Sequence, residues 1–581
     1  MTRHRCCTPV ALAGLAILMA LPAVARGQQE PAPIPAGQPP LPGAYSPAFD
    51  ALHYAIDITL PAQGAHINAT ATIDIALRQP ADTLALDLTG LAVDSVLAGR
   101  AGGAPLSRST FRQADGRLYV PVPAGAQAGD TLRVVVAYEG TPDDGLTIGV
   151  NEEGRRSVFA DNWPNRARFW IPSFDHPSDK ATVRWTVHAP KGWEVVANGE
   201  RVDSAGDKMA PDAPAPADGV WRWRLDVPIP VYTMVIGATD FAIGTVTPCA
   251  KGGVTPLRPD GCVPVEYWVY PDDSAYAAVV FKHAGDIVAY YTSLIAPYAY
   301  EKLAHVESAT RFGGMENVGA IFYDQRAMEA RRDIGNTVAH ETAHQWFGDG
   351  VTEKDWQELW LSEGFATYFA SLWAEHAQGE PSFRQSMERA KQQYLHSDVV
   401  GRPIVGPLQP GENLFWLLNA NSYEKGAWVL HMLRGMLGDS TFFDGLRRYY
   451  DAHRYGTATT ADLRHALEQA SGKDLQWFFK QWVYEPGYPQ LRVSRQWNAD
   501  SSVVLLKVAQ VQPASWPAFR APVTLAFSTP AGVVRRSGWL DGRHTTLRFK
   551  LPAEPTAVTL DPDGWLLHTM AGPQAASPPA G

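Results

Sequence analysis

The chain has 581 residues, of which 45% are hydrophobic, and it carries a formal net charge of −10 at pH 7. A chain this long exceeds what one hydrophobic core normally holds, so we expect about three domains. The negative charge and the lack of a long basic run argue against a nucleic-acid partner, and the acidic residues are more simply explained as a solvated surface.

Residues 1–25 have the pattern of a secretion signal. Arg3 and Arg5 precede an apolar run from Val10 to Leu21, and Ala23-Val24-Ala25 supplies the small residues of a cleavage site. An uncleaved membrane anchor is the alternative, but the run is shorter than the roughly 20 residues that span a bilayer. We therefore expect a secreted or periplasmic protein with no stable membrane insertion.

The next segments predict a tether and a β-rich domain. Residues 26–44 are rich in proline, which predicts a flexible tether. From 45 to 247, apolar residues recur at every second position in several short runs, most clearly at 67–77. This alternation predicts an N-terminal β-sheet domain, with 204–219 as a surface loop within it.

The second half of the chain predicts a helical domain and a small β domain. Helical patterning takes over in 248–489, after a strand at 263–269. In 490–570 short strand patterns return, which predicts a C-terminal β-sandwich, and residues 571–581 predict a disordered tail. The expected fold class is therefore multidomain α+β.

The cysteines indicate one disulfide. Of the four in the chain, Cys6 and Cys7 would leave with the signal peptide. Cys249 and Cys262 bracket a loop that contains glycine and proline. In an oxidising compartment they are predicted to close a disulfide, and a pair of free thiols is the alternative.

The segment from Thr337 to Phe347 predicts a helix with a metal site. It contains His340-Glu341-Thr342-Ala343-His344. Residues four apart lie about 40° apart around a helix axis, so both histidines can bind one zinc ion. Glu341 then lies beside the metal, where its carboxylate can take a proton from a water and pass it to a leaving amine. The alternative is two buried histidines on a structural helix.

Glu363 is the predicted third ligand. It follows the second histidine after eighteen intervening positions, and Ser362 is predicted to cap the second helix that contains it. Two antiparallel helices would bring Glu363 back to the histidines and leave a fourth position for water. The sequence thus predicts a metal-dependent hydrolase with one Zn²⁺ per chain, bound by His340, His344 and Glu363.

This ligand spacing resembles the gluzincin aminopeptidases of the aminopeptidase N and leukotriene hydrolase type. The segment Gly313-Gly314-Met315-Glu316-Asn317 is similar to the exopeptidase signature of that family, which usually has alanine at its second position. The resemblance implies that Glu316 binds the free α-amine of the substrate. It also implies that the backbone of the segment holds the peptide like an added strand.

Two further segments carry the resemblance. Tyr423-Glu424-Lys425-Gly426-Ala427 is similar to the segment whose tyrosine donates a hydrogen bond to the oxyanion of the tetrahedral intermediate, which implies this role for Tyr423. The stretch from Ala167 to Pro177 is similar to part of the family's N-terminal domain. The resemblance further implies a thermolysin-like catalytic domain over 248–489.

One departure from the family concerns the amine subsite. The family often supplies a second amine-binding Gln or Glu several positions before its Ala-Arg pair, and the corresponding run here is Phe159 to Pro164. Asp161 can substitute by charge, but its side chain is shorter, and the neighbouring Trp163 can reshape the subsite. The alternative for Asp161 is an ordinary acidic residue in a loop.

The function predicted from the sequence is a zinc aminopeptidase that acts on peptides with a free N-terminus, with a monomer as the working expectation. Three alternatives use the same scaffold. A zinc endopeptidase would share the metal site without the amine anchor, and activity on amino-blocked peptides would favour it. An epoxide hydrolase of the leukotriene type would act on a lipid epoxide. A non-catalytic binding module predicts loss of ligands or base, and none is lost.

Overall fold

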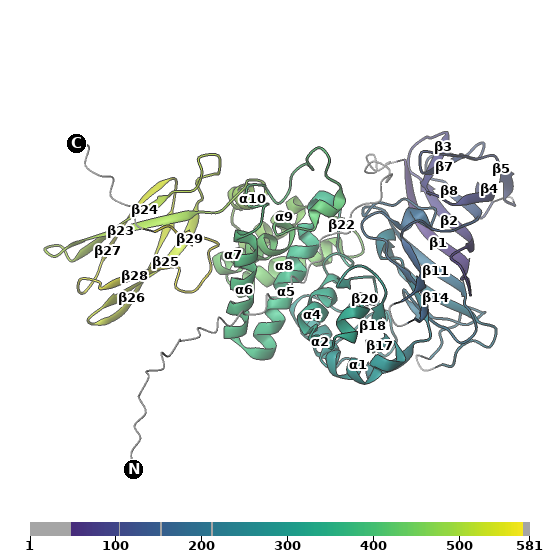
Figure 1. The fold of residues 1–581 in the computed structure, drawn as a ribbon. Coiled ribbons are helices and arrows are strands. Elements are labelled where there is room, and N and C mark those ends of the chain that lie inside the picture. Colours follow the sequence, from purple (N-terminus) through teal and green to yellow (C-terminus); the bar gives the residue numbers. More distant parts are fainter. Residues whose placement is uncertain (1–47, 104, 152–153, 211–212, 573–581) are drawn as a thin grey trace, which may run out of the picture.

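The computed structural model describes residues 48–103, 105–151, 154–210 and 213–572. The predicted signal peptide, the tether and nearly all of the predicted tail lie outside these residues. The described chain forms three domains in a row, with the mainly helical domain in the middle (Figure 1). The predicted multidomain α+β class is thus confirmed. None of the described helices combines the length and the apolar character needed to cross a membrane.

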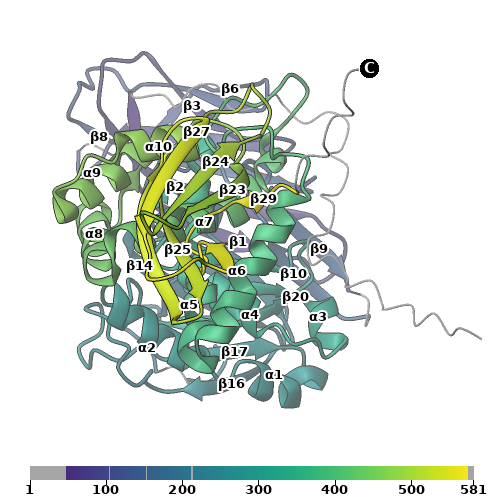
Figure 2. The ribbon, with the colours of Figure 1, turned by 90° about the vertical axis from the view of Figure 1, so that its left-hand side faces the viewer.

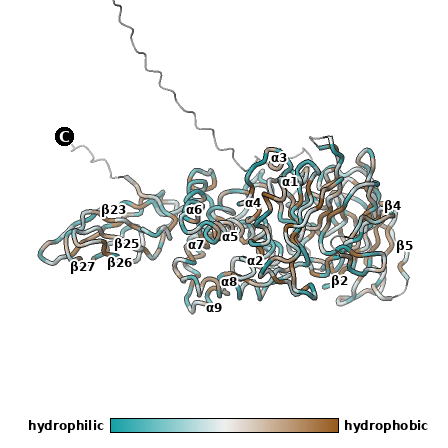
Figure 3. The backbone as a smooth tube through the Cα atoms, turned by 90° about the horizontal axis from the view of Figure 1, so that it is seen from below, coloured by the Kyte–Doolittle hydropathy of each residue, from teal (hydrophilic) through white to brown (hydrophobic). Residues whose placement is uncertain are grey.

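The N-terminal domain is built on an eight-stranded sheet in the order β13-β14-β11-β1-β2-β8-β4-β5. In β2 every second residue is buried, so one face of the strand covers the core. Figure 3 shows hydrophobic (brown) and hydrophilic (teal) stretches interspersed through this domain. Two smaller sheets, β3-β7-β6 and β12-β15-β10-β9, complete the domain. Its strands are β1 (Phe49–Thr59), β2 (Ile67–Leu77), β3 (Thr83–Asp87), β4 (Ala92–Arg100), β5 (Ser107–Ser109), β6 (Arg112–Ala114), β7 (Arg117–Pro121), β8 (Thr131–Gly140), β9 (Leu146–Val150), β10 (Arg156–Ala160), β11 (Lys180–His188), β12 (Glu194–Ala197), β13 (Glu200–Arg201), β14 (Val220–Pro230) and β15 (Ile236–Thr239).

The middle domain opens with a five-stranded sheet in the order β16-β17-β18-β20-β19. Its strands β17, β18 and β20 are parallel, and β19 is an antiparallel edge strand. Since β16 pairs with β17, the chain enters this sheet at Ala242, upstream of residue 248. The elements of this half are β16 (Ala242–Thr247), β17 (Val265–Val269), α1 (Ser274–Val280), α2 (Ala284–Leu294), β18 (Leu303–Ser308), β19 (Gly314–Met315), β20 (Ala320–Asp324) and α3 (Gln325–Glu329).

Helices form the second half of the middle domain. The helix α4 packs against both α5 and the edge strand β19, and α5 also packs against α7. These contacts place the two metal-binding segments side by side. The elements are α4 (Gly335–His344), β21 (Thr352–Glu353), α5 (Trp360–Gln378), α6 (Glu380–Leu395), α7 (Gly426–Leu437), α8 (Asp439–His453), β22 (Thr457–Ala458), α9 (Thr460–Ser471) and α10 (Gln476–Val483).

The helix that carries Glu363 begins earlier than predicted. It starts at Trp360 and continues a short 3-10 turn, η4 (Trp356–Glu358). The side chain of Asp355 accepts a hydrogen bond from the backbone N–H of Gln357 at the start of this turn. The prediction that Ser362 caps the helix is therefore wrong, because the capping side chain lies seven residues upstream.

The C-terminal domain is a two-layered sandwich with sheets β27-β24-β23-β29 and β26-β25-β28. Phe527 and Phe549 meet between the layers, with ring centroids 5.6 Å apart. Viewed along the long axis in Figure 2, these strands lie in front of α7. They are β23 (Gln490–Asn498), β24 (Val503–Gln510), β25 (Ala521–Thr529), β26 (Gly532–Leu540), β27 (His544–Lys550), β28 (Ala557–Leu560) and β29 (Thr569–Met570).

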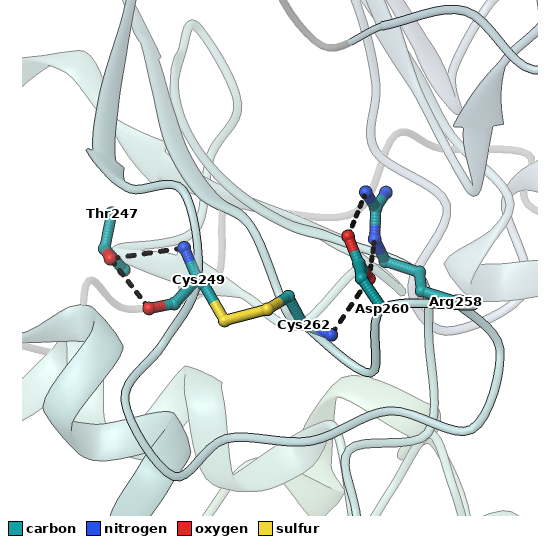
Figure 4. Close-up of a disulfide and its surroundings, with 5 residues drawn as sticks. All are labelled: Thr247, Cys249, Arg258, Asp260 and Cys262. Atoms are coloured by element: carbon teal, nitrogen blue, oxygen red, sulfur yellow. Dashed lines mark hydrogen bonds and ion pairs between the residues drawn. A yellow bond between two sulfur atoms is a disulfide. The ribbon is translucent and has the colours of Figure 1, made fainter.

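The two cysteines form a disulfide, as predicted. Figure 4 shows the bond at the base of the loop between β16 and β17, where the hydroxyl of Thr247 donates to the carbonyl of Cys249. Within the loop, Arg258 also pairs with Glu200 of the N-terminal domain. The disulfide therefore closes a loop that contacts both domains.

Candidate active site

Three side chains from α4 and α5 converge on one point. The Nε2 atoms of His340 and His344 lie 3.1 Å apart, and Oε2 of Glu363 lies 3.2 Å and 3.4 Å from them. Ligand atoms bound to one tetrahedral zinc ion at about 2.1 Å are about 3.4 Å from each other. The three atoms therefore fit zinc in both chemistry and spacing, and they can hold it while a fourth position stays open.

His344 is oriented by hydrogen bonds at its other ring nitrogen. Its Nδ1 lies 3.1 Å from the carbonyl oxygen of Phe347 and 2.9 Å from the hydroxyl of Ser362. A proton on Nδ1 satisfies the carbonyl and leaves the Nε2 lone pair free for a metal. Gly348 (φ 123°) allows this arrangement, because a Cβ there would lie 2.4 Å from the hydroxyl of Ser362.

Glu341 lies against the edge strand β19. A Cβ on Gly314 would be 2.1 Å from Oε1 of Glu341, so the second glycine of the Gly-Gly-Met-Glu-Asn segment leaves the space that the carboxylate occupies. The alanine usual in the family would require Glu341 to shift. Burial raises the pKa of Glu341 well above its usual value, and Glu316 and Glu363 add to this rise while His344 opposes it.

Tyr423 lies beside the third ligand. Its hydroxyl donates to Oε1 of Glu363 at 2.8 Å, and its ring is nearly parallel to that of His340. The tyrosine lies in a π-helical turn, η6 (Asn421–Lys425), just before α7. Gly364 and Gly426 let α5 and α7 approach closely, since a Cβ on Gly364 would be 2.9 Å from Cα of Gly426. Burial raises the pKa of Tyr423 well above its usual value, so the hydroxyl stays a donor.

The segment from Gly313 to Asn317 borders the same site. A carboxylate oxygen of Glu316 lies within 4.8 Å of ligand atoms of both Glu341 and His344. Gln345, on the helix side, donates to the backbone carbonyl of Glu316 at 2.9 Å and fixes the strand. Burial raises the pKa of Glu316, and the charge of Glu363 contributes. Among the described residues, the amide of Asn317 is buried without a hydrogen-bond partner.

Asp161 lies in a network of ion pairs. One of its carboxylate oxygens accepts from Arg166, and the other accepts from Nε of Arg311 at 3.2 Å. Asp144 pairs with the same two arginines. Both oxygens of Asp161 are therefore already engaged by guanidinium groups, and a role for Asp161 in binding a substrate amine stays a prediction.

Several residues behind the site had no signal of their own in the sequence. Gln345 also donates to Asp349 at 2.7 Å and accepts from the backbone of Gly319. Glu353 is buried, and in the described structure neither of its oxygens has a hydrogen-bond partner. Burial raises the pKa of Glu353 to about 8. Whether these polar side chains have hydrogen-bond partners depends on contacts between distant segments, which no local sequence pattern reveals.

Comparison with known proteins identifies the family. The Peptidase M1 N-terminal domain matches residues 50–213, and the Peptidase family M1 domain matches residues 281–482. In solved structures, the fold resembles native yeast LTA4 hydrolase, with a TM-score of 0.65 and 21% identity over 76% of this chain and 69% of that one. This likeness shows a shared fold.

Curated relatives carry aminopeptidase names. Aminopeptidase N of Streptomyces lividans is 27% identical over 80% of this chain and 53% of its own length. Glutamyl aminopeptidase of Bos taurus is 28% identical over 62% of this chain and 37% of its own length. The chain thus spans about half the length, or less, of the curated relatives it matches. The two matched domains, the shared fold and the converging His-His-Glu ligands together show that the chain belongs to peptidase family M1.

Proposed function

We propose that this chain is a zinc-dependent aminopeptidase, with one Zn²⁺ per chain, that releases the N-terminal residue from peptides. The observation that carries the proposal is the position of Glu316, whose carboxylate lies within 4.8 Å of ligand atoms of Glu341 and His344. A substrate ammonium that loses its water needs a carboxylate partner. An endopeptidase has no such need, so this buried acid favours exopeptidase chemistry.

The metal site is assigned to His340, His344 and Glu363. A zinc ion bound by them supplies a Lewis acid that polarises a carbonyl and lowers the pKa of a water towards roughly 7. Glu341, in contact with Gly314 on one side of this site, takes the proton of the attacking water and passes it to the leaving amine. Tyr423, beside Glu363, donates a hydrogen bond to the oxyanion that forms at the scissile carbonyl.

The substrate is held by the edge strand. In the proposal, Glu316 binds the α-amine, and the backbone of Gly313, Gly314 and Met315 pairs with the peptide as an added strand. The edge position of β19 supports this, because its outer side has no neighbouring strand in the described sheet. Holding the amine and the scissile bond on one rigid strand positions the carbonyl for attack.

We also infer that the protein works outside the cytoplasm, secreted or in the periplasm, and we take a monomer as its working form. The signal-like pattern of residues 1–25 supports export. The disulfide between Cys249 and Cys262 is of a kind favoured in oxidising compartments.

The test is hydrolysis of a panel of aminoacyl amides beside their N-acetylated counterparts, by the wild type and by Glu341→Gln, before and after chelation. The expected result is cleavage of the free-amine substrates alone, abolished by chelation, restored by Zn²⁺ and lost in Glu341→Gln. Glu388→Gln, a surface substitution on α6, serves as the control. Equal cleavage of acetylated substrates would point to an endopeptidase, and turnover of a lipid epoxide alone would point to an epoxide hydrolase.

A further inference from the structure

A pocket of about 270 Å³ lies beside the edge strand, and none of the three metal ligands lines it. It lies between β9 and β10 of the N-terminal domain and the carboxyl ends of β18 and β20, and its charged lining residues are Asp161, Arg311, Asp324 and Arg326. Crevices at domain interfaces and at the carboxyl ends of parallel strands are common ligand sites. The proposed peptide hydrolysis uses none of these four side chains.

The charges of this pocket are ordered by depth. The side chains of Asp161 and Asp324 are 3% and 14% exposed, whereas those of Arg311 and Arg326 are 33% and 39% exposed. The aspartate oxygens are all engaged by arginines or backbone. The acids therefore lie at the back and the guanidinium groups at the mouth, so the pocket presents its positive side to an incoming ligand.

Arg311 can donate hydrogen bonds beyond those that it already makes. Its Nε donates to Asp161 and its Nη2 donates to Asp144. Its Nη1 has no partner among the residues that the structure describes. A guanidinium held rigidly by two carboxylates, with free N–H groups at a pocket mouth, is suited to bind a third carboxylate through charge-assisted hydrogen bonds.

The pocket is within reach of a peptide on the edge strand. The backbone N–H of Asp324, which lines the pocket, lies 3.5 Å from the carbonyl oxygen of Gly313. The pocket is therefore adjacent to the residue that precedes β19. Gly314 touches Glu341 beside the metal site. Arg311 precedes Gly314 by three positions, which is at most about 11 Å of extended chain. A peptide that spans this distance has two or three residues beyond the scissile bond.

We propose that the pocket at Arg311 binds a carboxylate that the substrate carries two or three residues beyond the scissile bond. The favoured substrates are then tripeptides and tetrapeptides with a free C-terminal carboxylate, or peptides with an acidic side chain at that position. The inference rests on the proposed aminopeptidase function, and it names the class of peptide that the site prefers.

The test compares kcat/KM for three peptides that share the best N-terminal residue X of the aminoacyl amide panel. They are X-Gly-Gly with a free carboxylate, the same peptide as its C-terminal amide, and X-Gly-Asp amide. The wild type is expected to prefer the free carboxylate over the amide by about tenfold, since the guanidinium is partly exposed. If kcat/KM for X-Gly-Asp amide is near that for X-Gly-Gly, the pocket also binds acidic side chains. If it is near that for X-Gly-Gly amide, the pocket binds only a C-terminal carboxylate.

Substitutions assign the preference to Arg311. In Arg311→Gln the ratio between acid and amide is expected to fall to about one, whatever the absolute rate, and Arg311→Lys should keep part of it. Arg448→Gln, a surface arginine paired with Asp444 on α8, should keep the wild-type ratio. Because Arg311 also pairs with buried aspartates, thermal unfolding of each variant is measured alongside.

The outcomes separate this inference from the proposed function. If the wild type cleaves X-amide but has an acid-to-amide ratio near one, the carboxylate pocket is refuted and the aminopeptidase stands. If Arg311→Gln folds and keeps the tenfold ratio, another group binds the carboxylate and the assignment is refuted. If neither X-amide nor any peptide is cleaved, the proposed function itself fails.

Discussion

Replacing Tyr423 by Phe removes one hydroxyl and leaves the ring. That hydroxyl lies 2.8 Å from Oε1 of Glu363, whereas the two histidines face Oε2, so it can turn to a substrate oxyanion without leaving the site. Loss of one preorganised oxyanion donor costs about 100- to 1000-fold in kcat. We therefore expect Tyr423→Phe to lower kcat by that factor and to change KM little.

Stability and metal content tell this role apart from a structural one. The phenylalanine ring keeps its parallel contact with His340, and the lost hydrogen bond to a charged acceptor is worth about 1.5–3 kcal/mol. The variant should fold and keep one zinc ion per chain, measured by elemental analysis. Tyr394→Phe is the matched control, because its buried hydroxyl donates to the carbonyl of Gly487 and not to a metal ligand.

Either of two results for Tyr423→Phe would exclude the proposed role of its hydroxyl. A fall in kcat of less than tenfold with zinc retained would mean that the hydroxyl does not contact the transition state. A large fall accompanied by loss of zinc would mean that Tyr423 acts by holding Glu363. In both cases the assay is steady-state hydrolysis of the preferred aminoacyl amide at saturating substrate.

Four further predictions concern the metal, the disulfide and buried charges. Chelation should lower the unfolding temperature as well as abolish activity, since a ligand at 1,000 times its Kd stabilises by about 4 kcal/mol; an unchanged unfolding temperature would argue against a tightly bound ion. The double variant Cys249→Ser, Cys262→Ser opens a loop with a sequence separation of 13 and should lose about 3 kcal/mol of unfolding free energy with kcat retained, whereas a large fall in kcat would show coupling to the site. Asp161→Asn breaks a buried network with Arg166 and Arg311 and should cost about 3–5 kcal/mol, while a higher KM with unchanged stability would instead indicate contact with the substrate amine. Burial raises the pKa of Glu353 from 4.5 to about 8, so between these pH values the folded protein holds a proton that the unfolded chain releases, and the contribution of Glu353 to stability falls as the pH rises. In denaturant unfolding, Glu353→Gln should therefore gain unfolding free energy over the wild type, and this gain should grow from about pH 4.5 to about pH 8. A gain that does not change with pH would contradict the raised pKa.

The family and the fold class could be predicted because their signals are local. Alternation in 67–77 fixes which face of β2 is buried, whatever the strand pairs with. The two histidines of α4 share one helix face by geometry alone. Glu363 returns to them because α4 and α5 pack together, as the helix pattern indicated.

The features that the sequence did not reveal depend on contacts between distant segments. Asp161 meets Arg311 across 150 positions, and no local pattern shows that its oxygens are engaged. Ser362 looked like a helix cap because it precedes a helical pattern, but Asp355 begins the turn upstream and frees Ser362 to contact His344. The space for Glu341 beside Gly314 depends on how α4 lies on β19, which only the fold defines.

The binding of the substrate amine by Glu316 is tested by comparing the cleavage of a peptide with a free N-terminus and of its acetylated form, in the wild type and in Glu316→Ala. We expect the wild type to cleave the free-amine peptide at least about 1,000 times faster than the acetylated one, since an unpaired buried carboxylate and a lost ion pair each cost several kcal/mol. In Glu316→Ala this ratio should collapse by about 100-fold or more while zinc stays bound. A wild type that cleaves both peptides equally, or a variant that keeps the full ratio, would show that Glu316 does not anchor the substrate amine.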